Sequence, residues 1–471
     1  MISNRLSSWT NLSNYKNYLL TVLLVILASN FVDRVALGVL LQDIKVDLDL
    51  SDTQLGFLTG IAFALFYSVM GIPIARWADR GNRVAIITVT TVLWSAAVAL
   101  CGMAGSFWQL LLIRIGVAVG EAGCTPPAHS LIADYFTRAE RPRAMARYML
   151  GYPLSAVVGY FLAGWLNELY GWRVTFMLLG LPGLGLAALA WFTLKEPRRG
   201  KPTIETANPL PSFEAANAHP SLKEVCVTLW ANTSFRHLLL GYSVMCFFGN
   251  GITQWKPAFF IRSYGMETGE VGTWFAVIYG VSGLLGMYCG GALASRRAAH
   301  NEPLQLKAMA VAYAFFGVIS AGIYLSPNQY LAFGLLGLSL VGVYTTYGPL
   351  FATIQTLVQG RMRAMSIALV YLFANLIGMG LGPLAAGVLS DAFQPWAAEQ
   401  SLRYTLLVLC PGYLWAGWHL WRASATVARD LENVPVDRDG VPCEQDGVVN
   451  PADGFRGMSI EPILQNRGNP S

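Results

Sequence analysis

Four ionisable residues lie inside stretches of the chain that are otherwise apolar. Asp33 and Arg34 are adjacent in an apolar run from about residue 18 to residue 41. Arg114 and Glu121 lie seven residues apart in a later apolar run, a spacing that places two helical side chains within about 20° of each other. An ionised side chain costs roughly 3 kcal/mol near a bilayer centre on insertion scales, so these charges predict a shared polar site between helices.

The two carboxylates are candidates for proton coupling. Apolar surroundings disfavour the charged form of a carboxyl group unless a cation compensates. This property suits a group that takes up and releases a proton, so we predict that role for Glu121 first and for Asp33 second. Arg34 and Arg114 are predicted to bind substrate or to switch partners between the carboxylates. The alternative for all four residues is a static buried ion network.

Weaker candidates for substrate binding lie in the second half of the chain. Lys256 and the nearby Asn250 fall in one apolar span and are predicted to line a cavity, although a lysine can also snorkel to the membrane surface. Tyr347, Tyr371 and Asn375 are predicted to form the amphipathic wall of a cavity for a lipid-like molecule. Ordinary packing between helices is the alternative for each of them.

The composition shows which elements must position these residues. With 54% hydrophobic and 13% charged residues over 471 positions, the chain has about half the charge of an ordinary soluble protein. It is therefore predicted to be a polytopic membrane protein. Apolar windows of about 20 or more residues can cross the hydrocarbon core as helices, and we expect twelve of them. They cover about residues 17–42, 54–76, 84–105, 107–130, 144–167, 173–194, 236–263, 269–294, 306–326, 330–358, 364–391 and 402–423.

Basic residues gather in every second connection between the predicted spans. The connections that follow the second, fourth, sixth, eighth and tenth spans hold most of the Lys and Arg residues. Cytoplasmic loops carry such an excess, so we expect a multi-pass protein of the cell membrane with both termini in the cytoplasm. The formal charge of +5 reflects this topology and is no argument for nucleic acid binding.

A drop in hydropathy divides the chain into two sets of six spans. We predict an N-terminal six-helix bundle (1–194), a cytoplasmic linker (195–235), a C-terminal six-helix bundle (236–423) and a cytoplasmic tail without fixed structure (424–471). Apolar residues recur at helical spacing late in the linker, consistent with a short amphipathic helix at the membrane interface. A plain solvated linker is the alternative.

The two halves also repeat each other in sequence. Arg141-Pro-Arg143-Ala144-Met145 recurs 220 residues later as Arg361-Met-Arg363-Ala364-Met365, ahead of a Gly-rich span in both cases. Shorter matches in the same order imply a parallel pseudo-repeat, with a substrate site between the halves near mid-membrane. The predicted fold is thus an all-α membrane protein with twelve transmembrane helices in two six-helix pseudo-repeats.

One loop resembles a signature of the major facilitator superfamily. The stretch Ala75–Arg83 is similar to G-x-L-A-D-R-x-G-R, with matches at the charged core and departures at Ala75, Trp77 and Asn82. A carboxylate beside arginines at a helix end can form a cytoplasmic latch that breaks when the protein opens inward. A solvated turn whose arginines only fix topology is the alternative. The predicted gate consists of Asp79, Arg80, Arg83, Arg141 and Arg143.

Within that superfamily, the chain most resembles the Spinster family. The similarity lies in Asn30-Phe-Val-Asp33-Arg34, in Gly120-Glu121-Ala122 and in Gly171-Trp172-Arg173. Animal Spinster proteins are associated with export of sphingolipids and lysophospholipids, so the resemblance implies an amphiphilic substrate. The family pattern also implies that Arg114 organises its own helix. Organic-anion symporters of the superfamily carry the same Asp-Arg and Glu-Ala pairs.

The sequence therefore predicts a proton-coupled transporter of a lysolipid-like or other amphiphilic molecule, acting as a monomer. A symporter of small organic anions is the second hypothesis, and a membrane receptor without transport is the third. We find no phosphate-binding loop, zinc-protease motif or nucleophile elbow, so we expect no enzymatic activity and no cofactor. The seven cysteines form no metal-binding or redox spacing.

Overall fold

Helices make up every regular element in the residues that the structure describes. The computed structural model describes residues 2–137, 140–197, 222–297, 301–358 and 362–432. The first half contains α1 (Ile2–Leu48), α2 (Asp52–Thr59), α3 (Ile61–Arg80), α4 (Arg83–Cys101), α5 (Phe107–Glu121), α6 (Thr125–Tyr135), α7 (Arg141–Met149) and α8 (Gly151–Thr193). The second half contains α9 (Leu222–Ala231), α10 (Thr233–Tyr264), α11 (Thr268–Arg297), α12 (Glu302–Leu325), α13 (Gln329–Thr356), α14 (Arg363–Phe373), the π-helical segment η2 (Ala374–Leu381), α15 (Gly382–Ala397), the 3₁₀ turn η3 (Ala398–Gln400), α16 (Ser401–Leu409) and α17 (Gly412–Glu432).

Local sequence signals explain where several of these helices begin and end. At the start of α2, the Ser51 hydroxyl accepts a hydrogen bond from the Gln54 backbone, and the Gln54 side chain accepts one from the Ser51 backbone. This reciprocal capping box satisfies amide groups that a helix start leaves unpaired. Gly265 ends α10 with φ 65°, a left-handed conformation that glycine adopts without steric cost.

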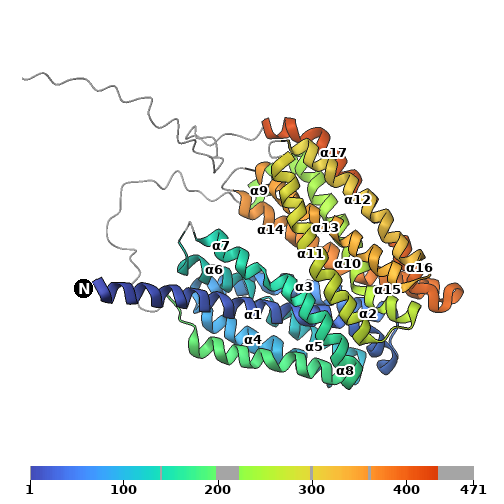
Figure 1. The fold of residues 1–471 in the computed structure, drawn as a ribbon, viewed down its shortest axis with the longest axis horizontal. Helices are drawn as coiled ribbons and strands as arrows, with labels where there is room; N and C mark the ends of the chain where they lie inside the picture. The colour runs from blue at the N-terminus through green and yellow to red at the C-terminus, as the bar shows by residue number, and fades with distance from the viewer. Residues whose placement is uncertain (1, 138–139, 198–221, 298–300, 359–361, 433–471) are drawn as a thin grey trace, which may run out of the picture.

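The helices pack as two groups that diverge toward one end of the molecule. Helices α1–α8 form the first group and α10–α17 the second, and the two groups meet near α2 and α15 (Figure 1). Toward the N-terminus of α1 they splay apart (Figure 1). We call the closed side the Asp52 end and the splayed side, where α4 begins, the Arg83 end.

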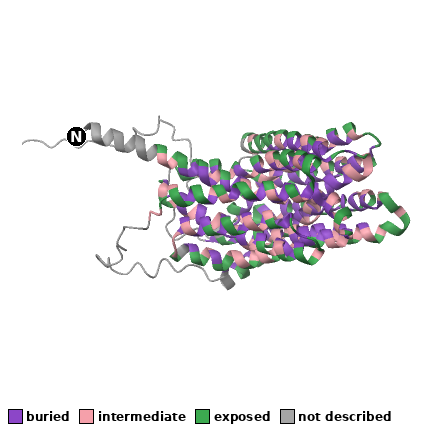
Figure 2. Ribbon diagram, turned by 90° about the horizontal axis from the view of Figure 1, so that it is seen from below, coloured by how far each residue is buried: buried purple, intermediate pink, exposed green. Residues whose placement is uncertain are grey.

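The outer surface of the helices is apolar, as expected for a membrane protein. Large hydrophobic side chains such as Leu112, Phe192 and Tyr288 are exposed, whereas buried residues follow the lines along which helices face one another (Figure 2). A soluble protein rarely exposes so much contiguous apolar surface, but lipid tails solvate it. The fold is therefore that of a multi-pass membrane protein.

Nine stretches of the described residues are long and apolar enough to cross a membrane. Two of these, Arg143–Thr193 and Met365–Glu432, contain 51 and 68 residues, which suffices for two crossings each at about 20 residues per crossing. Gly171, with φ 76°, breaks α8 at the point where the sequence predicts a turn. Helix α10 has 32 residues but is not among the nine stretches. Twelve crossings are consistent with these lengths, and the count stays a prediction.

Glycines allow the two groups to approach closely at the Asp52 end. A Cβ atom on Gly60 would lie 2.4 Å from the Gly380 carbonyl oxygen, and one on Gly56 would lie 2.5 Å from the Pro383 carbonyl oxygen. Real Cβ contacts are longer, so no other residue fits without displacing the backbone of η2 or α15. Small residues serve the same purpose wherever membrane helices pack tightly.

Helices occupy the end of the predicted linker and the start of the predicted tail. Late in the linker the chain forms helix α9, with Val225 and Leu229 buried and Trp230 exposed. Helix α17 continues to Glu432, so the start of the predicted tail is helical beyond the expected end at residue 423. The rest of the tail lies outside the described residues.

Candidate functional site

The four charges in the apolar helices form two buried ion pairs between α1 and α5. The Arg34 Nε donates to the Glu121 Oε2 at 2.6 Å, and the Arg34 Nη2 contacts the same oxygen. The Arg114 Nη1 donates to the Asp33 Oδ2 at 2.7 Å. Asp33, Arg114 and Glu121 are each at most 2% exposed. The structure therefore brings the predicted charges together, with each carboxylate bound to the arginine of the other helix.

Tight packing against α4 holds Glu121 in place. A Cβ atom on the preceding Gly120 would lie 2.6 Å from the backbone nitrogen of Trp94, and one on Gly123 would lie 2.3 Å from a methyl carbon of Thr90. The glycines therefore let the end of α5 lie directly against α4. Glu121 gains a fixed position because its own backbone cannot shift toward α4.

Part of the hydrogen-bonding capacity of this network is unused. Among the described residues, no hydrogen-bond partner exists for the Glu121 Oε1, for the Asp33 Oδ1 or for either polar atom of the Asn30 side chain. A buried polar atom without a partner costs about 1–3 kcal/mol. The network can thus accept a proton, a water molecule or a polar group of a ligand at these atoms.

Aromatic rings surround the Arg34 guanidinium. Its Cζ atom lies 4.2 Å from the centre of the Phe31 ring, 4.5 Å from that of Phe63 and 4.7 Å from that of Tyr67. Such cation–π contacts are worth about 2 kcal/mol or more when desolvated. On its other side, the Arg34 Nη1 lies 4.0 Å from the Met379 Sδ of η2. Arg34 consequently touches both groups of helices.

A cavity of about 100 Å³ lies between the ion pairs and the second group. Arg34, Arg114 and Thr59 line it from the first group, and Asn250, Gln254 and Met379 from the second. A second cavity of about 150 Å³ lies beside it within the second group, and its walls include Lys256 and several tyrosines. Asn250 and Thr253 border both cavities.

The other predicted binding residues are placed differently. Tyr347 lines the second cavity together with Lys256. Tyr371 is 46% exposed and its ring stacks on Phe351 at 5.2 Å, and neither Tyr371 nor Asn375 borders the two cavities. The pattern of polar residues in an apolar span did not reveal which helix face they occupy.

The contacts of Arg83 and Arg141, two of the predicted gate residues, stay within the first group among the residues that the structure describes. The fully buried Arg83 binds Asp134 at 2.7 Å and Glu196 at 2.5 Å. The Arg141 guanidinium donates to the carbonyl oxygens of Ala133 and Phe136, which are left free at the end of α6. All of these partners belong to the first half of the chain. Arg80 and Arg143 are exposed, and the Asp79 side chain lies outside the described residues.

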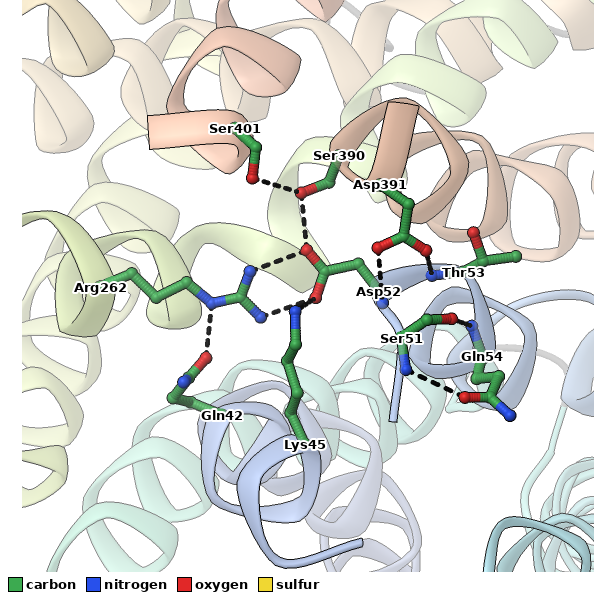
Figure 3. A network of polar contacts seen from close by, with 10 residues as sticks. All are labelled: Gln42, Lys45, Ser51, Asp52, Thr53, Gln54, Arg262, Ser390, Asp391 and Ser401. Carbon is green, nitrogen blue, oxygen red and sulfur yellow. Dashed lines mark hydrogen bonds and ion pairs between the residues drawn. The ribbon is translucent and has the colours of Figure 1, made fainter. Parts of the chain in front are cut away.

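Polar contacts between the groups are found instead at the Asp52 end (Figure 3). The Arg262 guanidinium grips both carboxylate oxygens of Asp52 at 2.8 Å, and the Lys45 Nζ binds Asp52 at 2.7 Å. The Ser390 hydroxyl donates to Asp52 at 2.6 Å, while Asp391 accepts hydrogen bonds from the backbone at the start of α2. We call Lys45, Asp52, Arg262, Ser390 and Asp391 the Asp52 cluster.

Sequence reasoning did not find the Asp52 cluster or the partners of Arg83. Asp52 belongs to an acidic connection whose charge is explained by exposure alone, and Asp134 and Glu196 lie near the ends of spans, where charges are common. Burial distinguishes Asp52 and the side chain of Glu196, which are 1% and 3% exposed, whereas Asp134 is exposed and is marked only by its contact with Arg83. The described ranges hold no group of three or more His, Cys, Asp or Glu residues that could ligate an ion.

Comparisons with known proteins found a matching family model, related sequences and similar structures. The family model described as Major Facilitator Superfamily matches residues 23–383. An MFS-type efflux pump of Mycolicibacterium smegmatis is 33% identical over 87% of this chain and 93% of its own length, and protein spinster homolog 1 of Xenopus tropicalis is 27% identical over 80% and 75%. A crystal structure of a bacterial homolog of the human lysosomal transporter Spinster, inward-facing and unoccupied, superposes with a TM-score of 0.79 at 29% identity, over 88% of this chain and 98% of that one.

Proposed function

The chain belongs to the major facilitator superfamily and is a membrane transporter rather than an enzyme, and from this premise we propose that it moves a lysolipid-like or other amphiphilic molecule by proton-coupled alternating access. We further propose that it acts as a monomer in the cell membrane. The Arg83 end and both termini then face the cytoplasm, as the distribution of basic residues supports.

The contact between Glu121 and Arg34 is the observation that carries the proton coupling. Glu121 is fully buried, and Arg34, its partner, lines the cavity between the two groups of helices. A proton on Glu121 removes the negative charge that holds Arg34 and frees the guanidinium to bind another anion or to move. By reciprocity, movement of Arg34 changes how readily Glu121 keeps its proton. Asp33 bound to Arg114 is the second proton site in the proposal.

The splayed arrangement of the helices supports alternating access. The two groups are held together at the Asp52 end and diverge at the Arg83 end (Figure 1). With the Arg83 end in the cytoplasm, this is an inward-open state, and the similar bacterial structure is described as inward-facing. The opposite state requires the Asp52 cluster to separate.

The likeness to Spinster proteins and the aromatic surroundings of Arg34 support an amphiphilic substrate. Phe31, Phe63 and Tyr67 offer apolar faces beside a cation, which suits a molecule with a charged group and an apolar body. The second candidate function is symport of small organic anions. It is favoured by the size of the two cavities, about 100 and 150 Å³, each of which is smaller than a typical pocket for a drug-sized ligand.

Transport into proteoliposomes under an imposed pH gradient tests the proposal. We expect the wild-type protein to accumulate a fluorescent lysophospholipid when protons flow in the opposite direction. Glu121→Gln mimics the protonated side chain permanently and should abolish gradient-driven accumulation, while exchange at equal pH persists.

The matched control is Glu302→Gln in the first turn of α12, a carboxylate remote from the network, which should transport normally. If Glu121→Gln still accumulates substrate in response to the gradient, Glu121 is not the coupling residue. If the wild type moves small organic acids but no lysolipid, the second candidate function is correct.

A further inference from the structure

Lys256 is a buried cation without a counter-ion in the part of the chain that the structure describes. It is 4% exposed, and no hydrogen bond or ion pair joins it to another described residue. Its Nζ lies 5.9 Å from the centre of the Tyr279 ring. An ionised side chain in a membrane interior is rare without a partner. The protein itself supplies no anion to Lys256 among the described residues.

The balance of charge differs on the other side of the interface. In the first group, Arg34 is matched by Glu121 and Arg114 by Asp33, so the four charges sum to zero. An anion that entered between the groups would meet two arginines whose positive charge is already balanced by a carboxylate. At Lys256 it would displace nothing.

The cavity at Lys256 is built to receive a polar group. Asn250, Thr253 and Lys256 follow one another at intervals of three residues along α10 and line the same cavity of about 150 Å³. The opposite wall holds the hydroxyl-bearing rings of Tyr279, Tyr344 and Tyr347. The Tyr279 hydroxyl is buried and has no hydrogen-bond partner among the described residues. One cation and one unused hydroxyl thus face the same small space.

We propose that this cavity is a subsite for an anionic group of the transported molecule, a carboxylate or a phosphate that pairs with Lys256 and accepts hydrogen bonds from the tyrosine hydroxyls. The inference rests on the proposed transport function and adds the charge of the substrate to it. The volume admits a head group but no long acyl chain, since pockets for whole drug-sized ligands start at about 300 Å³. The remainder of the molecule extends through the space bordered by Asn250 and Thr253, toward Arg34.

Binding of matched probes to the full-length protein in detergent tests the subsite. The probes are 1-oleoyl lysophosphatidate, which carries a phosphate and an acyl chain, 1-oleoylglycerol, which has the chain alone, and glycerol 3-phosphate, which has the phosphate alone. A hydrogen bond to a charged group corresponds to about a 10- to 100-fold change in affinity. We expect the wild type to prefer lysophosphatidate over oleoylglycerol by at least about tenfold.

Lys256→Gln should abolish this preference and leave the affinity for oleoylglycerol unchanged. Lys307→Gln, which removes an exposed lysine of α12, is the matched control and should keep the preference. Tyr347→Phe retains the ring and removes a hydroxyl, so it should weaken binding of the anionic probes only. The subsite is overturned if Lys256→Gln keeps the wild-type preference, or if the wild type binds neither anionic probe.

Two further readouts separate this inference from its premise. If glycerol 3-phosphate binds in a Lys256-dependent manner and neither oleoyl lipid binds, the subsite stands and the amphiphilic substrate is wrong. In the ligand-free state, Lys256→Met should melt at the same temperature as the wild type or higher, because it replaces an unpaired buried charge by an apolar side chain of similar size. A lower melting temperature would show that Lys256 has a structural partner and would overturn the proposal.

Discussion

The two ends of the molecule use charged residues in opposite ways. At the Asp52 end, Asp52 of the first group is bound by Arg262 and Ser390 of the second. At the Arg83 end, Arg83 is just as deeply buried, but its partners Asp134 and Glu196 come from the same half of the chain. Equal burial therefore does not mean equal function.

This difference between the two ends indicates which contacts must break during a transport cycle. Ion pairs inside one group move with it as a rigid unit and persist in every state. Pairs across the interface exist only while their end is closed. Among the described residues, only the ion pair of Asp52 with Arg262 crosses the interface, so we assign to it the largest effect on the equilibrium between states.

Removing the charge of Asp52 should change the populations of the two states most strongly. Loss of one partner from a buried ion pair costs about 3–5 kcal/mol. In Asp52→Asn the contact with Lys45 is weakened in both states, whereas the loss of the contact with Arg262 falls only on the state that is closed at the Asp52 end. The population open at that end should therefore rise at least tenfold, on the order of 1.4 kcal/mol or more. Spin labels at Val46 and Trp396, both exposed near this end, would report the longer distance.

The control for this variant is Asp47→Asn. Asp47 pairs with Arg173 at 2.7 Å at the same end, but both residues belong to the first group. The label distances should therefore remain those of the wild type. Equal shifts in both variants would mean that net charge at this end, and not the contact across the interface, decides the conformation.

Arg83→Gln should lower the stability of the protein without changing its conformation. The variant removes the contacts of a fully buried guanidinium with Asp134 and Glu196, so we expect a loss of about 3 kcal/mol in the free energy of unfolding. Distances between spin labels on the two groups should not change. A clear change in those distances would show that Arg83 also contacts the second group in another state.

Asp79→Asn is expected to have the smallest effect. If the predicted gate at the Arg83 end forms in the opposite state, loss of its carboxylate should favour the state that is open at this end, by about two- to fivefold, as for a surface ion pair. Labels at Leu150 and Met365, both exposed, can measure the populations. Unchanged populations would remove Asp79 from the gate and leave Arg80 without a function in it.

The sequence predicted the central charged residues correctly because an ionised group in an apolar helix needs an oppositely charged or polar partner nearby. Asp33, Arg34, Arg114 and Glu121 had to meet one another, and they do. The sequence could not predict which carboxylate binds which arginine. Adjacent helical residues point about 100° apart, so the rotation of α1 relative to α5 decides the pairing.

The Asp52 cluster illustrates the opposite situation. Asp52 and Arg262 are 210 residues apart and lie at span ends, where charged residues are expected in any membrane protein. No periodicity or motif distinguishes them from residues that only face water. Their importance arises from tertiary packing, which brings α2, α10 and α15 together.

The glycine contacts between α2 and the second group have a consequence for what the protein keeps out. Gly56 and Gly60 lie against the carbonyls of Pro383 and Gly380 so closely that not even a methyl group fits between them. A chain of water molecules does not fit through such a contact. Protons therefore cannot pass along hydrogen-bonded water at this point. Under the proposed proton coupling, this contact blocks one path for a proton leak at the closed end, so that the proton crosses together with the conformational change.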